Sequence, residues 1–121
     1  MISLIFIFLA GFFNSIMDII ATRFSNSIFK KFLSNSWVNP VLAWRNKWKD
    51  GDPKKGERFF GSSTFLVWTT DLWHCSKALM ITCIALSIVC YRPLINAKID
   101  WIFYLCLFGC SFECFWRLFK R

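Results

Sequence analysis

The chain has 121 residues, enough for one domain, and 56% of them are hydrophobic, with a mean hydropathy of +0.46. A soluble domain of this size could not bury so much apolar surface, so the composition excludes an ordinary soluble protein and predicts an integral membrane protein. The net charge is +8, and most of the basic residues lie between long apolar stretches. This arrangement favours anionic lipid over nucleic acid as the partner.

The first apolar segment covers residues 2–22 and stops at Arg23. At 1.5 Å per residue it is long enough to cross the hydrocarbon core of a bilayer. A signal peptide is the alternative interpretation, but no basic residue precedes the segment and no clear cleavage site follows it. We therefore expect a first transmembrane helix over residues 2–22.

Residues 24–64 are mixed in character. Asn39-Pro40 is a typical helix start, with an N-cap followed by proline at the first helical position, and Trp44 and Trp48 recur at helical spacing. The pattern predicts one or two amphipathic helices that lie in the membrane interface. Residues 49–56 are turn-rich, and Ser62, Ser63 and Thr64 are suited to cap the next helix.

Two further apolar segments cover residues 65–91 and 99–117. The link between them is short, which predicts two antiparallel neighbours in a hairpin. The expected fold is therefore an all-α membrane protein with a single transmembrane domain over residues 1–121. It has three transmembrane helices, at about 2–22, 65–91 and 99–117, and the interfacial helices of residues 24–64.

The distribution of lysine and arginine predicts the orientation. Nine basic residues lie between Arg23 and Arg58 and three more lie at the C-terminal end, whereas the link after the second segment carries only Arg92 and Lys98. Because positive residues stay on the cytoplasmic side, we expect a multi-pass inner-membrane protein with the N-terminus outside and the C-terminus in the cytoplasm.

Ionisable residues inside the apolar segments need an explanation, because charge in hydrocarbon is costly. The candidates for catalysis or proton relay are Asp18, Asp71, His74 and Glu113, which the predicted topology places at similar depth in the inner leaflet. Asp71 and His74 have i,i+3 spacing, so the carboxylate can orient the imidazole. We expect these four residues to share one polar site, with Asp18 at its edge.

A structural role is the favoured alternative for the same residues. Asp71, His74 and Lys77 would then neutralise one another, Glu113 would pair with Arg117, and Asp18 would pair with Arg23. A metal site is a third possibility, but the sequence contains no H-x3-H or H-E-x-x-H pattern. We therefore predict no metal and no cofactor, and leave open whether the protein is an enzyme.

Small residues are arranged along the predicted helices. In the first segment Gly11, Ser15 and Asp18 recur at three- and four-residue steps, a pattern typical of helix–helix contacts in membranes. Five of the six cysteines lie deep in apolar segments. We interpret them as reduced residues that pack inside the protein, including Cys106, Cys110 and Cys114 on one side of the third helix.

The basic stretch has two interpretations. The simpler one is a positive-inside signal that attracts anionic lipid. The other is a binding surface for lipid headgroups or phosphate, for which the candidate residues are Arg45, Lys47, Lys49, Lys54, Lys55 and Arg58.

The block WRNKWKDGDPKKGERFFGSSTFLVWTTDLWH, from Trp44 to His74, resembles small inner-membrane proteins of gut-type anaerobic bacteria. The resemblance covers about a quarter of the chain and implies a bacterial inner membrane, but no activity.

For function, we predict a membrane component that works as a homo-oligomer or within a larger assembly. It would use its inner-leaflet polar cluster for ion or proton passage or for contact with lipid headgroups. The alternatives are an enzyme acting on a phospholipid or isoprenoid-phosphate headgroup, and a pore-forming toxin or defence effector.

Overall fold

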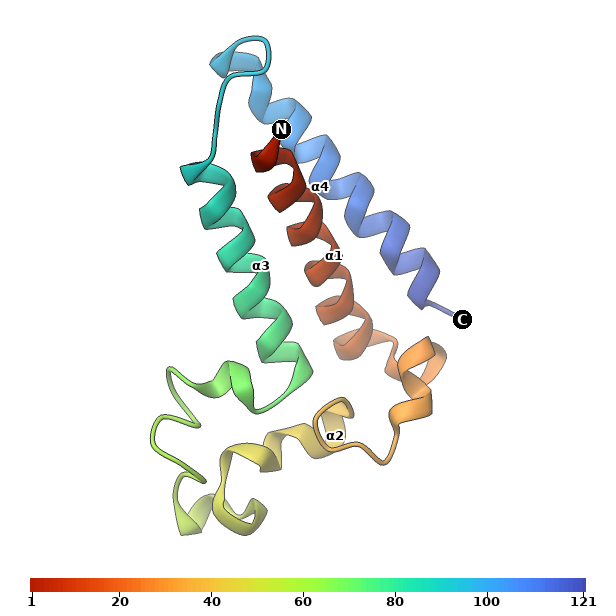
Figure 1. Ribbon diagram of the computed structural model, residues 1–121. Helices are drawn as coiled ribbons and strands as arrows, with labels where there is room; N and C mark the ends of the chain where they lie inside the picture. Colours follow the sequence, from red (N-terminus) through yellow and green to blue (C-terminus); the bar gives the residue numbers. More distant parts are fainter.

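A computed structural model of the chain describes residues 1–121 and is all-helical (Figure 1). Three long helices dominate it: α1 (Ile2–Thr22), α3 (Leu72–Val89) and α4 (Ala97–Phe119). Each is long and apolar enough to cross a membrane. The expected all-α fold with three candidate membrane spans is therefore confirmed.

The three helices are not arranged as expected, because α1 lies between α3 and α4 (Figure 1). It packs against both, whereas α3 and α4 have almost no direct contact. The predicted hairpin between the second and third spans is therefore wrong as a packed pair, although the two helices do run in opposite directions. The short link of residues 90–96 is long enough to pass over the end of α1.

α1 and α4 run parallel and are joined along their whole length by polar contacts. The Ser3 hydroxyl meets the Tyr104 hydroxyl at 2.6 Å, and the Ser111 hydroxyl donates to the Phe8 carbonyl at 2.6 Å. Near the other end the Trp116 indole N–H donates to Asp18 at 2.7 Å. In a lipid environment such bonds hold helices together where the hydrophobic effect does not.

α1 and α4 approach each other closely at Gly11. A Cβ atom placed there would stand 2.6 Å from the Phe108 carbonyl oxygen and 2.8 Å from the Ser111 Cβ. Gly11 and Ser15 are both buried. The small-residue pattern of the first span therefore marks a helix contact, as predicted.

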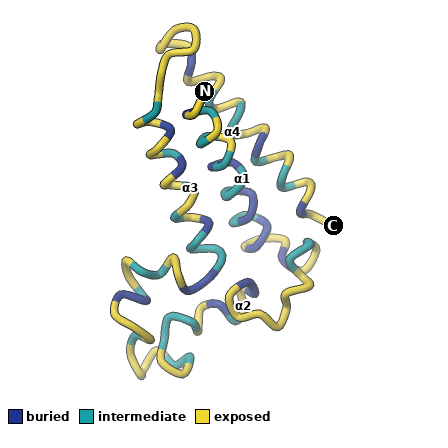
Figure 2. Tube along the Cα trace, in the orientation of Figure 1, coloured by how far each residue is buried: buried dark blue, intermediate teal, exposed yellow.

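A small apolar core closes the lower end of the bundle. Ile16, Ile19 and Ile20 of α1 pack with Phe119, and further aromatic rings surround them. Phe12 and Phe29 meet the Phe119 ring edge-on, with centroids 5.9 and 5.5 Å apart. Elsewhere the outer sides of α3 and α4 are exposed, as Figure 2 shows in yellow. This is the pattern of a protein whose solvent is lipid.

Residues 23–71 form a layer at one end of the bundle, which we call the base (Figure 1). Its only α-helix is α2 (Pro40–Ala43), a single turn capped by Asn39 as the sequence predicted. The rest consists of 3-10 turns, namely η1 (Phe24–Asn26), η2 (Ile28–Phe32), η3 (Trp44–Lys47), η4 (Lys49–Gly51), η5 (Pro53–Lys55) and η6 (Val67–Thr69). α2 runs directly into η3, so residues 40–47 form a short helical stretch after the predicted Asn39-Pro40 start.

The span boundaries also differ from the prediction. The second helix begins at Leu72 and not at residue 65, because the side chain of Asp71 caps it and residues 65–70 form turns. Ser62, Ser63 and Thr64 are therefore not its cap. The third helix begins at Ala97 and is capped by Asn96.

The C-terminus returns to the base. The Arg121 N–H donates to the Asn26 carbonyl at 2.8 Å, and Ser27 and Lys120 form an isolated antiparallel bridge. The basic residues at the C-terminal end therefore lie on the same side of the bundle as the basic base.

The close approach at Gly11 gives a test of the packing. Gly11→Ala should destabilise the protein by about 1–3 kcal/mol, because the added methyl group overpacks the contact with α4. Gly109→Ala, compared at dilutions at which the chain is monomeric in detergent, is the matched control, since a Cβ there meets nothing within 4 Å in the chain. Both variants gain about 1 kcal/mol of helix propensity, so their difference isolates the steric effect. Thermal unfolding in detergent measures it, and equal melting temperatures would contradict the predicted contact.

Candidate functional site

The strongest cluster of chemistry-bearing residues lies where α3 leaves the base. Asp71 is 3% exposed and has an extended backbone. Its carboxylate accepts a hydrogen bond from the His74 backbone N–H at 2.9 Å, which caps the helix. It also accepts one from the Thr70 hydroxyl at 3.1 Å. The expected position of Asp71 one or two turns inside the second helix is therefore corrected to its N-cap.

The same carboxylate holds the imidazole of His74. The Nδ1 atom of His74 lies 2.7 Å from one Asp71 oxygen and 2.9 Å from the other. A carboxylate at Nδ1 favours a proton on that nitrogen and leaves Nε2 for another partner. The predicted pairing of Asp71 with His74 is therefore confirmed.

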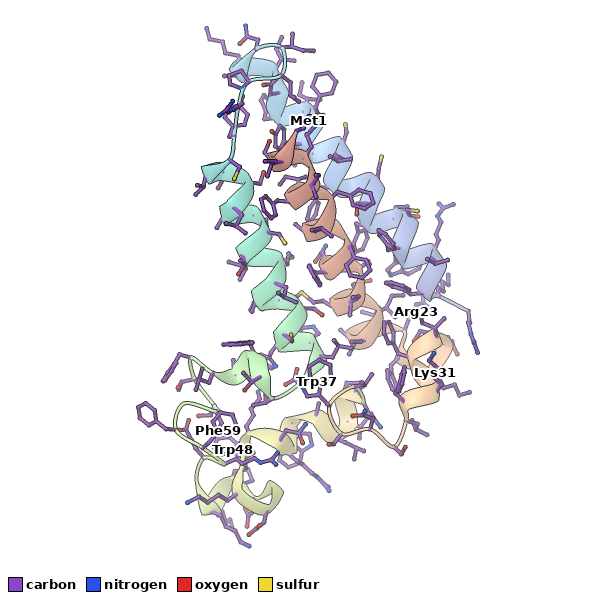
Figure 3. All side chains as sticks on the ribbon, in the orientation of Figure 1. Met1, Arg23, Lys31, Trp37, Trp48 and Phe59 are labelled. Atoms are coloured by element: carbon purple, nitrogen blue, oxygen red, sulfur yellow. The ribbon has the colours of Figure 1, made fainter.

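The base fixes this corner through backbone contacts. The Leu72 N–H donates to the Trp37 carbonyl at 2.9 Å, and the Trp37 indole donates to the Thr69 carbonyl at 3.3 Å. The Asn46 amide donates to the carbonyls of Ser36 and Thr70. Figure 3 shows Trp37 beside the start of α3. The residues immediately before and after Asp71 are therefore hydrogen-bonded to Trp37 and Asn46 of the base.

A cavity of about 220 Å³ opens beside the pair. Lys47, Asp71 and His74 supply its charged and polar wall. The rest is apolar or aromatic and comes from the end of α1, from α2 and η3, and from the start of α3, through Ile20, Ala21, Pro40, Ala43, Trp44 and Trp73. Three chain segments far apart in the sequence thus meet around one histidine.

The other candidate residues lie in separate contacts. Glu113 pairs with Arg117 at 2.6 Å, as the structural interpretation predicted. Asp18 accepts from Trp116 and does not pair with Arg23, which corrects that part of the interpretation. Lys77 lies over the Trp73 ring, 5.2 Å from its centroid. No hydrogen bond or ion pair joins Asp71 and His74 to Asp18 or Glu113, and no three His, Cys, Asp or Glu side chains form a group that could hold a metal.

The six candidate basic residues of the base are in different surroundings. Lys47 lines the cavity, Lys55 pairs with Asp50 at 2.9 Å, and Arg45 lies over the Trp44 ring. Lys49, Lys54 and Arg58 are exposed. Lys47 is therefore the only one of the six that shares a site with His74.

The cysteines are all free thiols. Cys83 is buried as expected, but Cys106, Cys110 and Cys114 are exposed on the outer side of α4. They do not pack inside this chain, because α4 turns its aromatic side to α1. The prediction that these three are internal packing residues is wrong for the single chain.

One buried acid was missed by the sequence reasoning. Asp100 is 1% exposed and accepts from the Tyr91 hydroxyl at 2.8 Å and from the backbone N–H of Leu94 at 2.7 Å. It also accepts more weakly from the N–H groups of the next two residues. The signal was the pairing of Asn96 as N-cap with an acid in the first turn of the helix. Asp100 therefore fixes the link between α3 and α4 at the end opposite the base.

No protein-family model, curated protein or solved structure matches this chain. Function is therefore inferred from the geometry of the chain itself.

The Asp71 contacts give a stability prediction. Asp71→Ala removes the cap of α3 and should lower the free energy of unfolding by about 0.5–2 kcal/mol. Asp71→Asn keeps a capping oxygen and should cost less. Asp52→Ala is the control, because Asp52 caps only the short turn η5. Hydrogen exchange at Leu72–Cys75 measures the effect, and equal exchange in Asp71→Ala and Asp52→Ala would count against the cap.

A second prediction concerns the far part of the base, where Glu57 orders the turn that follows it. Its carboxylate accepts from the Ser63 hydroxyl and from the N–H groups of Gly61 and Ser63. These bonds, the Ser63 hydroxyl first, lower the pKa of Glu57 below its ordinary value. The folded carboxyl thus holds its charge more firmly than the unfolded one, so its contribution to stability is present above the unfolded pKa and disappears as pH falls through the folded pKa.

Acidification through the lowered Glu57 pKa should therefore loosen residues 57–63. The NMR signals of the Gly61 and Ser63 amides should shift as pH falls through the lowered Glu57 pKa, and Glu57→Gln should remove that transition. An unchanged transition in Glu57→Gln would assign it to another group.

Proposed function

We propose that this protein is a self-associating component of a bacterial inner membrane, with its N-terminus outside and its base in the cytoplasm. The orientation follows from the basic residues of the base and of the C-terminal end, which lie together at one end of the bundle. The contact between copies is assigned to the outer side of α4.

The single observation that carries this proposal is the composition of that side. Cys106, Gly109, Cys110 and Cys114 recur at three- and four-residue steps and are exposed. Space is open beside Gly109. Small residues of this spacing let two helices approach closely in a membrane, where packing and not the hydrophobic effect drives association.

The charges on the same side agree with a second copy as the occupant. Glu113 and Arg117 continue the line of small residues, and their side chains are 51% and 76% exposed. Charge that faces lipid inside a span is costly. In a two-fold pair of parallel copies the side meets itself, so that Glu113 of each copy approaches Arg117 of the other and the exposed charges are covered.

The opposite side of α4 cannot serve this purpose, because it is already used within the chain. Phe115 packs against Phe8 and Phe12 of α1 with ring centroids 5.7 and 4.8 Å apart, and Ser111 is bonded to α1. The helix is thus divided into an intramolecular aromatic side and a free side of small residues.

The native thiols provide the test. In variants that keep one cysteine each, mild oxidation in membranes at low expression should cross-link chains through Cys106, Cys110 or Cys114. Cys83, which is buried, should not cross-link. Ile81→Cys in a background without other cysteines is the exposed control on α3, because Ile81 is 53% exposed.

Gly109→Leu should abolish the α4 cross-links and leave the fold of the single chain intact, since a Cβ there touches nothing in the chain. Cross-linking at position 81 without cross-linking on α4 would assign the interface to α3 and refute the proposal.

A further inference from the structure

We propose that the cavity beside Asp71 and His74 binds a phosphate group, held by Lys47 and by the Nε2 atom of His74. This is separate from self-association through α4, because every lining residue of the cavity comes from α1, the base or α3.

The size of the cavity restricts the ligand. Its volume of about 220 Å³ is below the range of about 300–1,000 Å³ typical of pockets that enclose a whole drug-sized molecule. It therefore fits one small headgroup, and any attached acyl chains must leave it. Trp44 and Trp73 line the cavity, and tryptophan favours the headgroup level of a bilayer.

The charges fit an anion. Lys47 is the only lysine or arginine that lines the cavity, and its side chain makes no ion pair in the chain. The charge of Asp71 faces His74 and the capping N–H of α3. The cavity also lies at the N-terminal end of an 18-residue helix, where the helix dipole favours negative charge.

The end of α1 at the same cavity opposes an anion, because a helix C-terminus carries partial negative charge. That effect is reduced here. The Ile19 carbonyl accepts from the Arg23 N–H at 2.9 Å, and the Asp18 carbonyl accepts from the Thr22 hydroxyl at 2.7 Å. The electrostatic potential in the cavity is then set mainly by the cationic Lys47 and the N-terminus of α3, and it favours an anion.

The role of His74 follows from its two nitrogens. Nδ1 is occupied by Asp71, and no other hydrogen bond reaches the ring. A phosphate oxygen at Nε2 needs a proton on that nitrogen, so His74 is an imidazolium in the complex and Asp71 balances its charge. The negative phosphate, the positive His74 and the negative Asp71 thus alternate in charge, and Lys47 supplies the second positive charge to the phosphate.

The experiment uses the fact that His74 is the only histidine in the chain. The full protein with ¹⁵N-labelled histidine is placed in maltoside detergent micelles, which contain no phosphate, and titrated in three arms, with phosphatidic acid, inorganic phosphate, and oleic acid as an anion without phosphorus. We expect phosphatidic acid to move the Nε2 signal toward the imidazolium position while Nδ1 stays protonated.

The arms identify the source of the phosphate. A response to phosphatidic acid alone supports a lipid headgroup, and saturation by inorganic phosphate supports a free phosphate ligand. An equal response to oleic acid, or no response in any arm, would overturn the proposal.

Variants test the contact with lysine. Lys47→Met should weaken phosphate binding about tenfold or more, because it removes a charge-assisted hydrogen bond. Lys47→Arg should retain most of the binding. Lys49→Met is the matched control, since Lys49 is exposed and does not line the cavity. Ser62 and Arg58 donate hydrogen bonds to the backbone carbonyl of residue 47 and not to its side chain. Substitution of Lys47 therefore leaves these structural contacts of the base in place. Equal weakening in both methionine variants would mean that only the general positive charge of the base matters.

Discussion

The close approach of α1 and α4 at Gly11 is the constraint on which the arrangement of the helices depends. There is no side chain at that position, so the Ser111 hydroxyl reaches the Phe8 carbonyl across the contact. Once α4 is seated on one side of α1, α3 has the other side available, and the link of residues 90–96 passes over the end of α1. Asp100 holds this link by accepting hydrogen bonds from its backbone.

The central position of α1 has consequences for both proposed sites. Because α1 takes the aromatic side of α4, the small residues and the Glu113–Arg117 pair of that helix face outward. Because the end of α1 reaches the base beside α3, Ile20 and Ala21 close the cavity that contains His74. The central position of α1 therefore leaves the proposed contact surface of α4 facing outward and closes one wall of the cavity proposed to bind phosphate.

The base positions the residues at the start of α3 through contacts across the layer. Its helical stretches are short: α2 and η3 together cover residues 40–47, and η5 covers only three residues before Gly56. Its backbone and side chains instead make contacts across the layer, such as those of Trp37 and Asn46 with residues 69–72. Lys47 thereby lines the same cavity as a histidine that lies 27 residues further along the chain.

The sequence by itself determined the number of spans, the segregation of charge and the local pairs. Long apolar runs, the i,i+3 spacing of Asp71 and His74, and the i,i+4 spacing of Glu113 and Arg117 are local properties, and each is confirmed. The tertiary structure alone decided which helix is central, which side of α4 is free, and that Asp18 meets Trp116 and not Arg23. The start of the second span was also decided there, because Asp71 caps α3 only while the base holds the preceding residues out of the helix. Hydropathy and spacing describe one helix at a time, whereas these outcomes depend on how closely two helices approach, and that distance is set by a single glycine and the hydroxyl group that faces it.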